Sequence, residues 1–302
     1  MEGSHVSDDT LMLNQFRVAA GKIPGTDHTK PGEPFWKNCQ DACRVEASDN
    51  ALVLVVCDGN GSQPHSEVGA TLSAQLLARN IVDQIDKSVQ SGIPIGIPEI
   101  LEEARLSLMD LFEDLGDHLM GSFSDNANRY MLATALVAVV TKAETVIAGI
   151  GDGYYAVNDE LVELGPFPGN APPYPVYGLT GSSLLDHAPE LLHFTIHRTL
   201  PTDEVETLAV MSDGVKYLID AQGTPMPKNP QARVPALAQF WREDRFTKNP
   251  DNIRRQLALI NIEVITSSPD GKPHLRTGML KDDTTIIVVQ RAAEAVVLNA
   301  EE

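Results

Sequence analysis

Short apolar runs rich in Val and Ile recur along the chain, and they constrain its fold more than any other feature. They cover residues 51–57, 132–141, 145–150, 154–157, 208–211 and 284–289. Most of these runs are bounded by Gly, Asp, Asn, Ser or Lys. Apolar segments of this length between turn-forming residues are typical of buried β-strands. The sequence therefore predicts sheets at the centre of the molecule.

Two long amphipathic patterns interrupt these strands. Residues 66–87 place five apolar side chains on one stripe, namely Val68, Leu72, Leu76, Leu77 and Ile81. Residues 98–119 repeat the pattern with Ile100, Leu101 and Leu108. Such spacing predicts helices that bury one face. Two further helices are expected at residues 234–242 and 251–260. Helix pairs set between runs of strands predict an α+β fold, with sheets inside and helices outside.

The remaining segments carry loop signals. Residues 165–175 hold five prolines and two glycines, so residues 159–191 are expected to be mostly loop. A polar stretch at 267–277 leads into the last strand, and residues 292–302 are expected to be a short helix or a frayed tail. No linker divides the series of strands. We therefore expect one domain over residues 1–302, with a core at about 35–291 and short extensions at both ends.

The charge balance argues against two classes of partner. The 302 residues include 23 basic and 42 acidic side chains, which gives a formal net charge of −19. That charge repels nucleic-acid backbones and anionic lipid, so we expect neither nucleic acid nor a membrane surface as a partner. The longest apolar stretch, 131–140, is about half of what a membrane crossing requires. The simplest interpretation of the charge is solubility.

Cysteine usage and the start of the sequence indicate a compartment. Cys39, Cys43 and Cys57 are odd in number, and their spacing fits no zinc motif. The opening residues 1–5 contain no basic segment followed by an apolar one, as a secretory signal would. These two features favour the reducing cytoplasm.

Aspartates stand at strand ends four times. They are Asp58 before Gly59, Asp152 between two glycines, Asp213 before Gly214, and Asp282 before Asp283. A single Asp-Gly is most simply a turn. Four carboxylates that converged, however, would repel one another unless a cation neutralised them. These loops contain no His, so an all-oxygen site for Mg²⁺ or Mn²⁺ is favoured over a zinc site.

The ordered motifs resemble one known family. They are Asn38-Cys39-Gln40-Asp41-Ala42, Asp58-Gly59-Asn60-Gly61-Ser62 with Glu67-Val68, Thr134-Ala135-Leu136-Val137, Gly151-Asp152, Ser212-Asp213-Gly214 and Asp282-Asp283-Thr284-Thr285. Each motif alone is weak, but their order and spacing over 38–285 resemble the metal-dependent serine/threonine protein phosphatases of type 2C. The resemblance implies a four-layer αββα sandwich, in which two antiparallel sheets are flanked by helix pairs and the metals lie at one end.

The resemblance also implies roles for individual residues. Asp58 would bridge two metal ions, and the backbone carbonyl of Gly59 would bind one of them. Asp213 and Asp282 would complete the shell of the other ion, so these three aspartates would carry catalysis. Asp41 would hold a water molecule on the metals.

A third, weaker metal site is also implied, at Asp152, although Gly153 replaces the Ser that the family has next to it. Asp283 stands where many relatives have Asn, and is expected to be a neighbour of the ligands rather than a ligand. The cofactors implied are two Mn²⁺ or Mg²⁺ ions, with this third site as an addition.

Three further positions depart from the family pattern. Asn60 stands where eukaryotic members often carry a His that is thought to act as general acid, and an amide cannot supply a proton. Trp36 stands where the family has its phosphate-binding Arg. The adjacent Lys37 is the substrate-binding candidate, and it would act as a point charge rather than as a planar bidentate group. Ser62 replaces a second Gly.

The function implied is hydrolysis of phosphoserine or phosphothreonine in proteins by a water activated between two metal ions. The expected partners are a phosphorylated protein and a cognate serine/threonine kinase, in a signalling pathway. Two alternatives stay open. One is an inactive phosphatase-like module that binds a phosphoprotein or a kinase, which the changes at Trp36 and Asn60 favour. The other is a metal-dependent hydrolase of a different phosphoester.

Overall fold

A computed structural model describes residues 15–29, 39–181, 188–267 and 273–292. The strands are β1 (Phe16–Ile23), β2 (Ala42–Ala47), β3 (Ala51–Cys57), β4 (Ala135–Thr141), β5 (Glu144–Ile150), β6 (Gly153–Val157), β7 (Glu160–Leu164), β8 (Thr195–Pro201), β9 (Thr207–Met211), β10 (Val264–Ser267), β11 (Pro273–Arg276) and β12 (Thr284–Arg291). The α-helices are α2 (Ser66–Ser91), α3 (Ile97–His118), α4 (Phe123–Tyr130), α5 (Tyr177–Thr180), α6 (Val215–Ala221), α7 (Gln239–Arg242), α8 (Arg245–Lys248) and α9 (Asp251–Ile260). Single 3₁₀ turns are η1 (Thr26–His28), η2 (Pro168–Asn170), η3 (Pro189–Leu192) and η4 (Thr202–Glu204).

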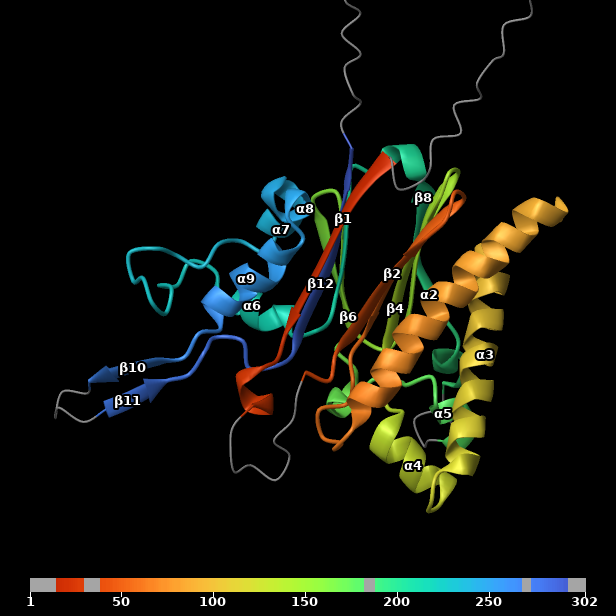
Figure 1. The fold of residues 1–302 in the computed structure, drawn as a ribbon, viewed down its shortest axis with the longest axis horizontal. Helices are drawn as coiled ribbons and strands as arrows, with labels where there is room; N and C mark the ends of the chain where they lie inside the picture. Colours follow the sequence, from red (N-terminus) through yellow and green to blue (C-terminus); the bar gives the residue numbers. More distant parts are fainter. Residues whose placement is uncertain (1–14, 30–38, 182–187, 268–272, 293–302) are drawn as a thin grey trace, which may run out of the picture.

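Two five-stranded antiparallel sheets form the centre of the molecule. One has the order β1-β12-β9-β6-β7 and the other has the order β2-β3-β4-β5-β8. A separate hairpin, β10-β11, projects away from the sandwich (Figure 1). Because β5 belongs to one sheet and β6 to the other, the short turn between them crosses from sheet to sheet at one end of the sandwich.

Strand β3 shows why the apolar runs are continuous. All seven of its residues are buried. Successive side chains of a strand point to opposite faces, so Leu52 and Leu54 enter the core between the sheets, whereas Val53 and Val55 pack under the helices. A strand that is buried on both faces carries no polar alternation.

Helices cover both outer faces of the sandwich. The long helices α2 and α3 lie against the sheet that contains β3, and the shorter helices α6 to α9 lie against the sheet that contains β12 (Figure 1). The layers therefore follow the order helix, sheet, sheet, helix. This arrangement confirms the predicted α+β fold with a four-layer αββα sandwich.

Several elements differ from the sequence-based expectations. Strand β1 was not expected, because Arg17, Gly21 and Lys22 interrupt its apolar residues, yet it pairs along its whole length with β12 at the edge of a sheet. Strand β1 lies before residue 35, at which the expected core begins. The helix expected at 234–242 is only the four-residue α7, and the expected loop at 159–191 contains β7 and α5. The tail at 293–302 lies outside the described residues.

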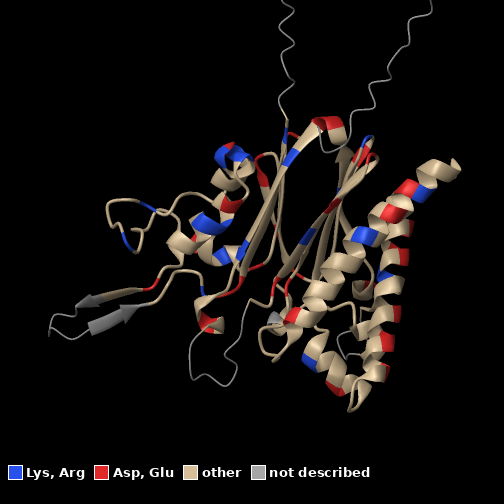
Figure 2. Ribbon diagram, in the orientation of Figure 1, with Lys and Arg blue, Asp and Glu red and all other residues tan. Residues whose placement is uncertain are grey.

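The charge is unevenly distributed over the helices. Helix α3 carries seven acidic residues and, apart from His118 at its end, a single basic residue, Arg105 (Figure 2). These carboxylates form part of the outer surface, on the helix layer. In the described part of the chain, no helix combines the length and the apolar character that a membrane span needs.

Candidate active site

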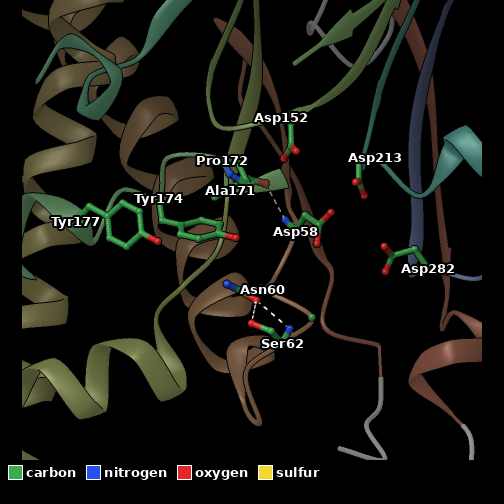
Figure 3. Close-up of a pocket in the computed structure, with 12 residues that line it drawn as sticks. Asp58, Asn60, Ser62, Asp152, Ala171, Pro172, Tyr174, Tyr177, Asp213 and Asp282 are labelled. Atoms are coloured by element: carbon green, nitrogen blue, oxygen red, sulfur yellow. Dashed lines mark hydrogen bonds between the residues drawn. The ribbon is translucent and has the colours of Figure 1, made fainter. Parts of the chain in front are cut away.

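The candidate active site is a cleft of about 370 Å³ where strand ends from both sheets meet. It is lined by Asp58, Asn60, Gly61, Ser62, Thr134, Asp152, Ala171, Pro172, Tyr174, Tyr177, Asp213 and Asp282. Figure 3 shows four aspartates around one space, with the two tyrosines on the opposite side from Asp213 and Asp282. The structure thus brings together four of the carboxylates that the sequence analysis singled out.

Asp58 is held by the strand that precedes it and by a neighbouring loop. It follows β3 directly, and its N–H donates to Thr134 Oγ1 over 3.1 Å. The N–H of Thr134 donates to the carbonyl oxygen of Asp58 over 2.9 Å in return. The next residue, Gly59, leaves no room for a side chain, because a Cβ there would lie 2.6 Å from the carbonyl oxygen of Gln40. A side chain at this position would therefore displace the backbone of this loop or of Gln40.

Asp213 and Asp282 meet because β9 and β12 are antiparallel neighbours. Met211 at the end of β9 is in register with Ile286 near the start of β12. Asp213, just past the end of β9, and Asp282, just before the start of β12, therefore lie at the same end of the sheet. A Cβ on Gly214 would overlap the carbonyl oxygen of Asp283, so this close approach requires glycine.

Asp152 comes from the turn that crosses between the sheets. Gly151 and Gly153 on either side have φ values of +99° and +142°, which L-residues with side chains rarely adopt. The departure from the family pattern at Gly153 therefore coincides with a backbone conformation that a Ser would adopt only under strain.

Asp41 does not line the cleft but is buried beside it, with 1% of its surface exposed. Its Oδ2 accepts a hydrogen bond from Ser212 Oγ at 2.8 Å, and its Oδ1 has no hydrogen-bond partner. Lys22 Nζ donates to the backbone carbonyl of Asp41 over 2.6 Å. Hydrogen bonds with Thr285 and Ser212 also lower the pKa of this carboxylate, against the effect of burial.

Burial makes these carboxylates hard to ionise together. It raises the pKa of Asp41 to about 7, with a further contribution from the charge of Asp283. It raises the pKa of Asp152 to about 7 as well, with Asp213 as the next cause. Burial also raises the pKa of Asp58 and of Asp213 above the ordinary range. Such a cluster holds protons at neutral pH unless a cation replaces them.

The donor set fits a hard divalent cation. None of the described residues that line the cleft is Lys or Arg. The positive charges that act on its aspartates come from just outside it, from His28 beside Asp282 and from Lys216 near Asp213. Asp41 Oδ1 and Asp213 Oδ1 are buried without a hydrogen-bond partner, and a buried oxygen without a partner is uncommon. Within the described residues, no three His, Cys, Asp or Glu side chains are close enough together to hold a metal ion as they stand. The carboxylate oxygens are thus of the type that a hard divalent cation prefers, and they come from aspartates that converge on one cleft.

Two residues at this end of the molecule were missed or undervalued in the sequence analysis. His28 Nε2 lies 3.0 Å from Asp282 Oδ1, and its Nδ1 makes an ion-pair contact of 3.2 Å with Asp283 Oδ2. Hydrogen bonds that the imidazole donates to these two aspartates raise the pKa of His28 to about 10. The Asp283 carboxylate also accepts the N–H groups of Gly25 at 2.7 Å and Gln40 at 2.5 Å. No spacing in the sequence links His28 to Asp282, so only the fold could reveal the pair.

The predicted substrate-binding residue, Lys37, lies outside the described residues, as does Trp36. Asn60 and Ser62, which also depart from the family pattern, lie within the described residues. Asn60 lines the cleft, and its Oδ1 accepts hydrogen bonds from the N–H and the Oγ of Ser62 at 2.8 and 2.6 Å.

Comparisons with solved structures give weak overall similarity. The serine/threonine phosphatase Stp1 from Staphylococcus aureus is 14% identical, covers 97% of this chain and 100% of its own, and has a TM-score of 0.46. RsbX in complex with magnesium is 15% identical, with coverages of 92% and 96% and a TM-score of 0.45. A bacterial serine phosphatase is 16% identical, with coverages of 92% and 99% and a TM-score of 0.44.

A comparison with curated proteins finds no match. Models of protein families give the decisive result, because the model described as Protein phosphatase 2C matches residues 25–258. That match covers well over half of the chain and includes the loops of Asp41, Asp58, Asp152 and Asp213. The chain belongs to the protein phosphatase 2C family.

Proposed function

We propose that this protein is a metal-dependent phosphatase that removes phosphate from phosphoserine or phosphothreonine in proteins. The observation that carries the proposal is the convergence of Asp58, Asp152, Asp213 and Asp282 on one cleft from four separate segments of the chain. Their burial without a balancing Lys or Arg among the described lining residues supports a site built for divalent cations.

In this proposal, Asp58 and the carbonyl oxygen of Gly59 hold Mn²⁺ or Mg²⁺ together with Asp213 and Asp282. Asp152 serves a weaker third site. When bound, two such ions supply an activated water as nucleophile and offset the charge on the phosphoryl oxygens.

The chain's own groups keep the ligands in position. Thr134 Oγ1 anchors the backbone of Asp58, and Ser212 Oγ anchors one oxygen of Asp41. The free Oδ1 of Asp41 can then accept a hydrogen bond from a water molecule in the site. Lys37 would contribute a positive charge to substrate binding. Asn60 cannot protonate the leaving group, so that proton comes from water or from another side chain.

We also propose that residues 1–302 form one domain that acts in the cytoplasm on a phosphorylated protein, with a serine/threonine kinase as its counterpart. An alternative is a phosphatase-like module that binds such partners without hydrolysis. The specific observation in its favour is the pair of substitutions at Trp36 and Asn60.

The test is hydrolysis of p-nitrophenyl phosphate and of a phosphothreonine peptide with Mn²⁺, with Mg²⁺ and with a chelator. Asp213→Asn keeps the shape of the side chain but removes its charge, and we expect it to abolish turnover while the protein stays folded. Asp110→Asn is the matched control, because Asp110 is exposed on α3 and is not one of the described residues that line the cleft.

Metal-dependent release of phosphate that Asp213→Asn loses and Asp110→Asn keeps would support the phosphatase. No release, with Mn²⁺ binding still measurable by calorimetry, would favour the binding module. An Asp213→Asn protein that stays active with an unchanged metal requirement would contradict the assignment of this aspartate.

A further inference from the structure

The cleft lacks a described positive side chain, although a phosphate group carries negative charge. Of the described residues that line it, the charged ones are all aspartates. Metal ions would neutralise these aspartates, but they would not by themselves orient the substrate on the side of the cleft away from Asp213 and Asp282. Neutral side chains that line that side can supply hydrogen-bond donors to the substrate.

Asn60 presents such a donor in a fixed direction. Its Oδ1 accepts the N–H of Ser62 at 2.8 Å, and a backbone N–H can only donate. This bond settles which atom of the amide is oxygen, so the Nδ2 group is the end that is free to donate. The backbone is also anchored, because the N–H of Asn60 donates to Leu132 O at 2.9 Å and its carbonyl accepts from Ser66 Oγ at 3.0 Å.

Tyr174 presents a second donor from a different segment. Only 6% of its surface is exposed, and its ring packs edge-on against Tyr177 with centroids 5.3 Å apart. Burial, followed by the charge of Asp58, raises the pKa of the phenol, so the hydroxyl keeps its proton. Figure 3 shows the hydroxyl of Tyr174 pointing toward Asp58, above Asn60.

The other polar side chains that line this part of the cleft are less suitable. Ser62 Oγ donates its proton to Asn60 Oδ1. Thr134 Oγ1 is held at the backbone of Asp58, whose N–H it accepts. For Tyr177, burial is the sole cause of a raised pKa, without any contribution from the aspartates. In the view of Figure 3, Tyr174 lies between Tyr177 and Asp58.

We propose that the amide of Asn60 and the hydroxyl of Tyr174 form a neutral two-donor clamp that binds the phosphoryl oxygens of the substrate. This inference rests on the proposed function for its substrate class. It assigns substrate binding to a residue after β3 and to a residue of the segment before α5. It also gives Asn60 a role that requires no proton transfer, since an amide donates a hydrogen bond without ionising.

The test measures phosphate binding separately from turnover. Tyr174→Phe removes one hydroxyl and keeps the ring, and Asn60→Ala removes the amide. Inorganic phosphate is titrated into each Mg²⁺-loaded protein by calorimetry, and KM and kcat are measured with the phosphothreonine peptide. Tyr130→Phe is the matched control, because Tyr130 stacks on His65 and is not one of the described residues that line the cleft.

We expect each variant to weaken phosphate binding and to raise KM by about tenfold, the effect of losing one hydrogen bond to a charged group. Mg²⁺ affinity and the melting temperature should stay at wild-type values, as they should in Tyr130→Phe. If the wild type binds phosphate without hydrolysing the peptide, the proposed function fails, but weaker binding by both variants still supports the clamp. Wild-type phosphate affinity in both variants, or no phosphate binding by the wild type, overturns the inference.

Discussion

The imidazole Nε2 of His28 lies 3.0 Å from Oδ1 of Asp282, although the two residues come from opposite ends of the described chain. Strand β1 makes this possible, because it pairs with β12 from Phe16↔Arg291 to Ile23↔Thr284. The turn that follows β1 therefore lies next to the residues that precede β12. His28 also sits against Gly61, where an added Cβ would be 3.1 Å from the ring. The ring thus joins Asp282 to the loop of Asp58.

Replacement of His28 tests the importance of this contact for the ligands. We expect His28→Asn to weaken Mn²⁺ binding by about 10- to 100-fold, the usual effect of removing a group that orients a metal ligand. Calorimetry with Mn²⁺ is the measurement. His118→Asn, at the exposed end of α3, is the control and should bind Mn²⁺ like the wild type. Equal affinities in all three proteins would show that Asp282 does not need His28.

The raised pKa values predict how the stability of the metal-free protein depends on pH. Asp41 and Asp152 have pKa values of about 7 in the folded state against 3.8 for an ordinary Asp, so the folded state holds protons that the unfolded chain releases. The free energy of unfolding should therefore fall as the pH rises from about 4 to 7. The titration of His28 should lower the free energy of unfolding further at higher pH. Its positive charge, which stabilises the folded state, is complete below pH 6.5 and is lost as the pH rises toward 10.

Urea unfolding at pH 5 and pH 8, with chelator and with Mn²⁺, measures this dependence. With chelator, the urea midpoint should be lower at pH 8. Mn²⁺ should raise the midpoint more at pH 8 than at pH 5, because fewer protons compete for the carboxylates. A metal-free midpoint that rises between pH 5 and pH 8 would contradict the raised pKa values.

Ser212 joins two parts of the site through one buried hydroxyl. Its Oγ donates to Asp41 Oδ2 at 2.8 Å and accepts the N–H of Thr285 at 2.9 Å. Ser212→Ala leaves both groups buried without this partner, so we expect the free energy of unfolding to fall by about 1–3 kcal/mol. Ser107→Ala, which removes only a hydroxyl that donates to the carbonyl of Glu103 one turn earlier in α3, should change it far less. Urea unfolding of the two variants measures both losses in the free energy of unfolding, and equal losses would contradict the prediction.

Gly214 marks the closest approach between the two loops that carry Asp213 and Asp282. Because an added Cβ would overlap the carbonyl oxygen of Asp283, Gly214→Ala must move one loop. We expect a loss of about 1–3 kcal/mol in the free energy of unfolding, together with weaker Mn²⁺ binding. At Gly178 the nearest atoms to an added Cβ are 3.8 Å away, so Gly178→Ala is the control. Thermal melts and Mn²⁺ titrations of both variants provide the comparison.

Elements whose signals are local could be predicted closely. The run expected at 51–57 coincides with β3, and the helix expected at 251–260 coincides with α9. Strand β3 is buried throughout, and α9 buries Ile253, Leu257 and Ile260 at helical spacing. Strand β1 could not be predicted in this way, because an edge strand needs only part of its residues to be apolar. The four-residue α7 likewise lacks the length over which a helical period can be recognised.

The aspartates were found from sequence because each one flanks a strand, and Asp58, Asp152 and Asp213 also stand next to a glycine, which is a local pattern. That Asp58, Asp152, Asp213 and Asp282 share one cleft depends on the pairing of β9 with β12 and on the passage from β5 to β6 between the sheets. Those pairings bring together residues that are distant in the sequence, and no local period encodes them.

Local patterns in the sequence therefore predict the strands with continuous apolar runs, the two long helices and the aspartates beside strand ends. They can do so because propensity and periodicity act over a few neighbouring residues. Only the tertiary structure decided that His28 contacts Asp282, that Asn60 and Tyr174 face one cleft, and that Asp41 lies buried beside it. These relationships depend on register and layer packing, which arise when the whole sandwich buries its apolar surface at once.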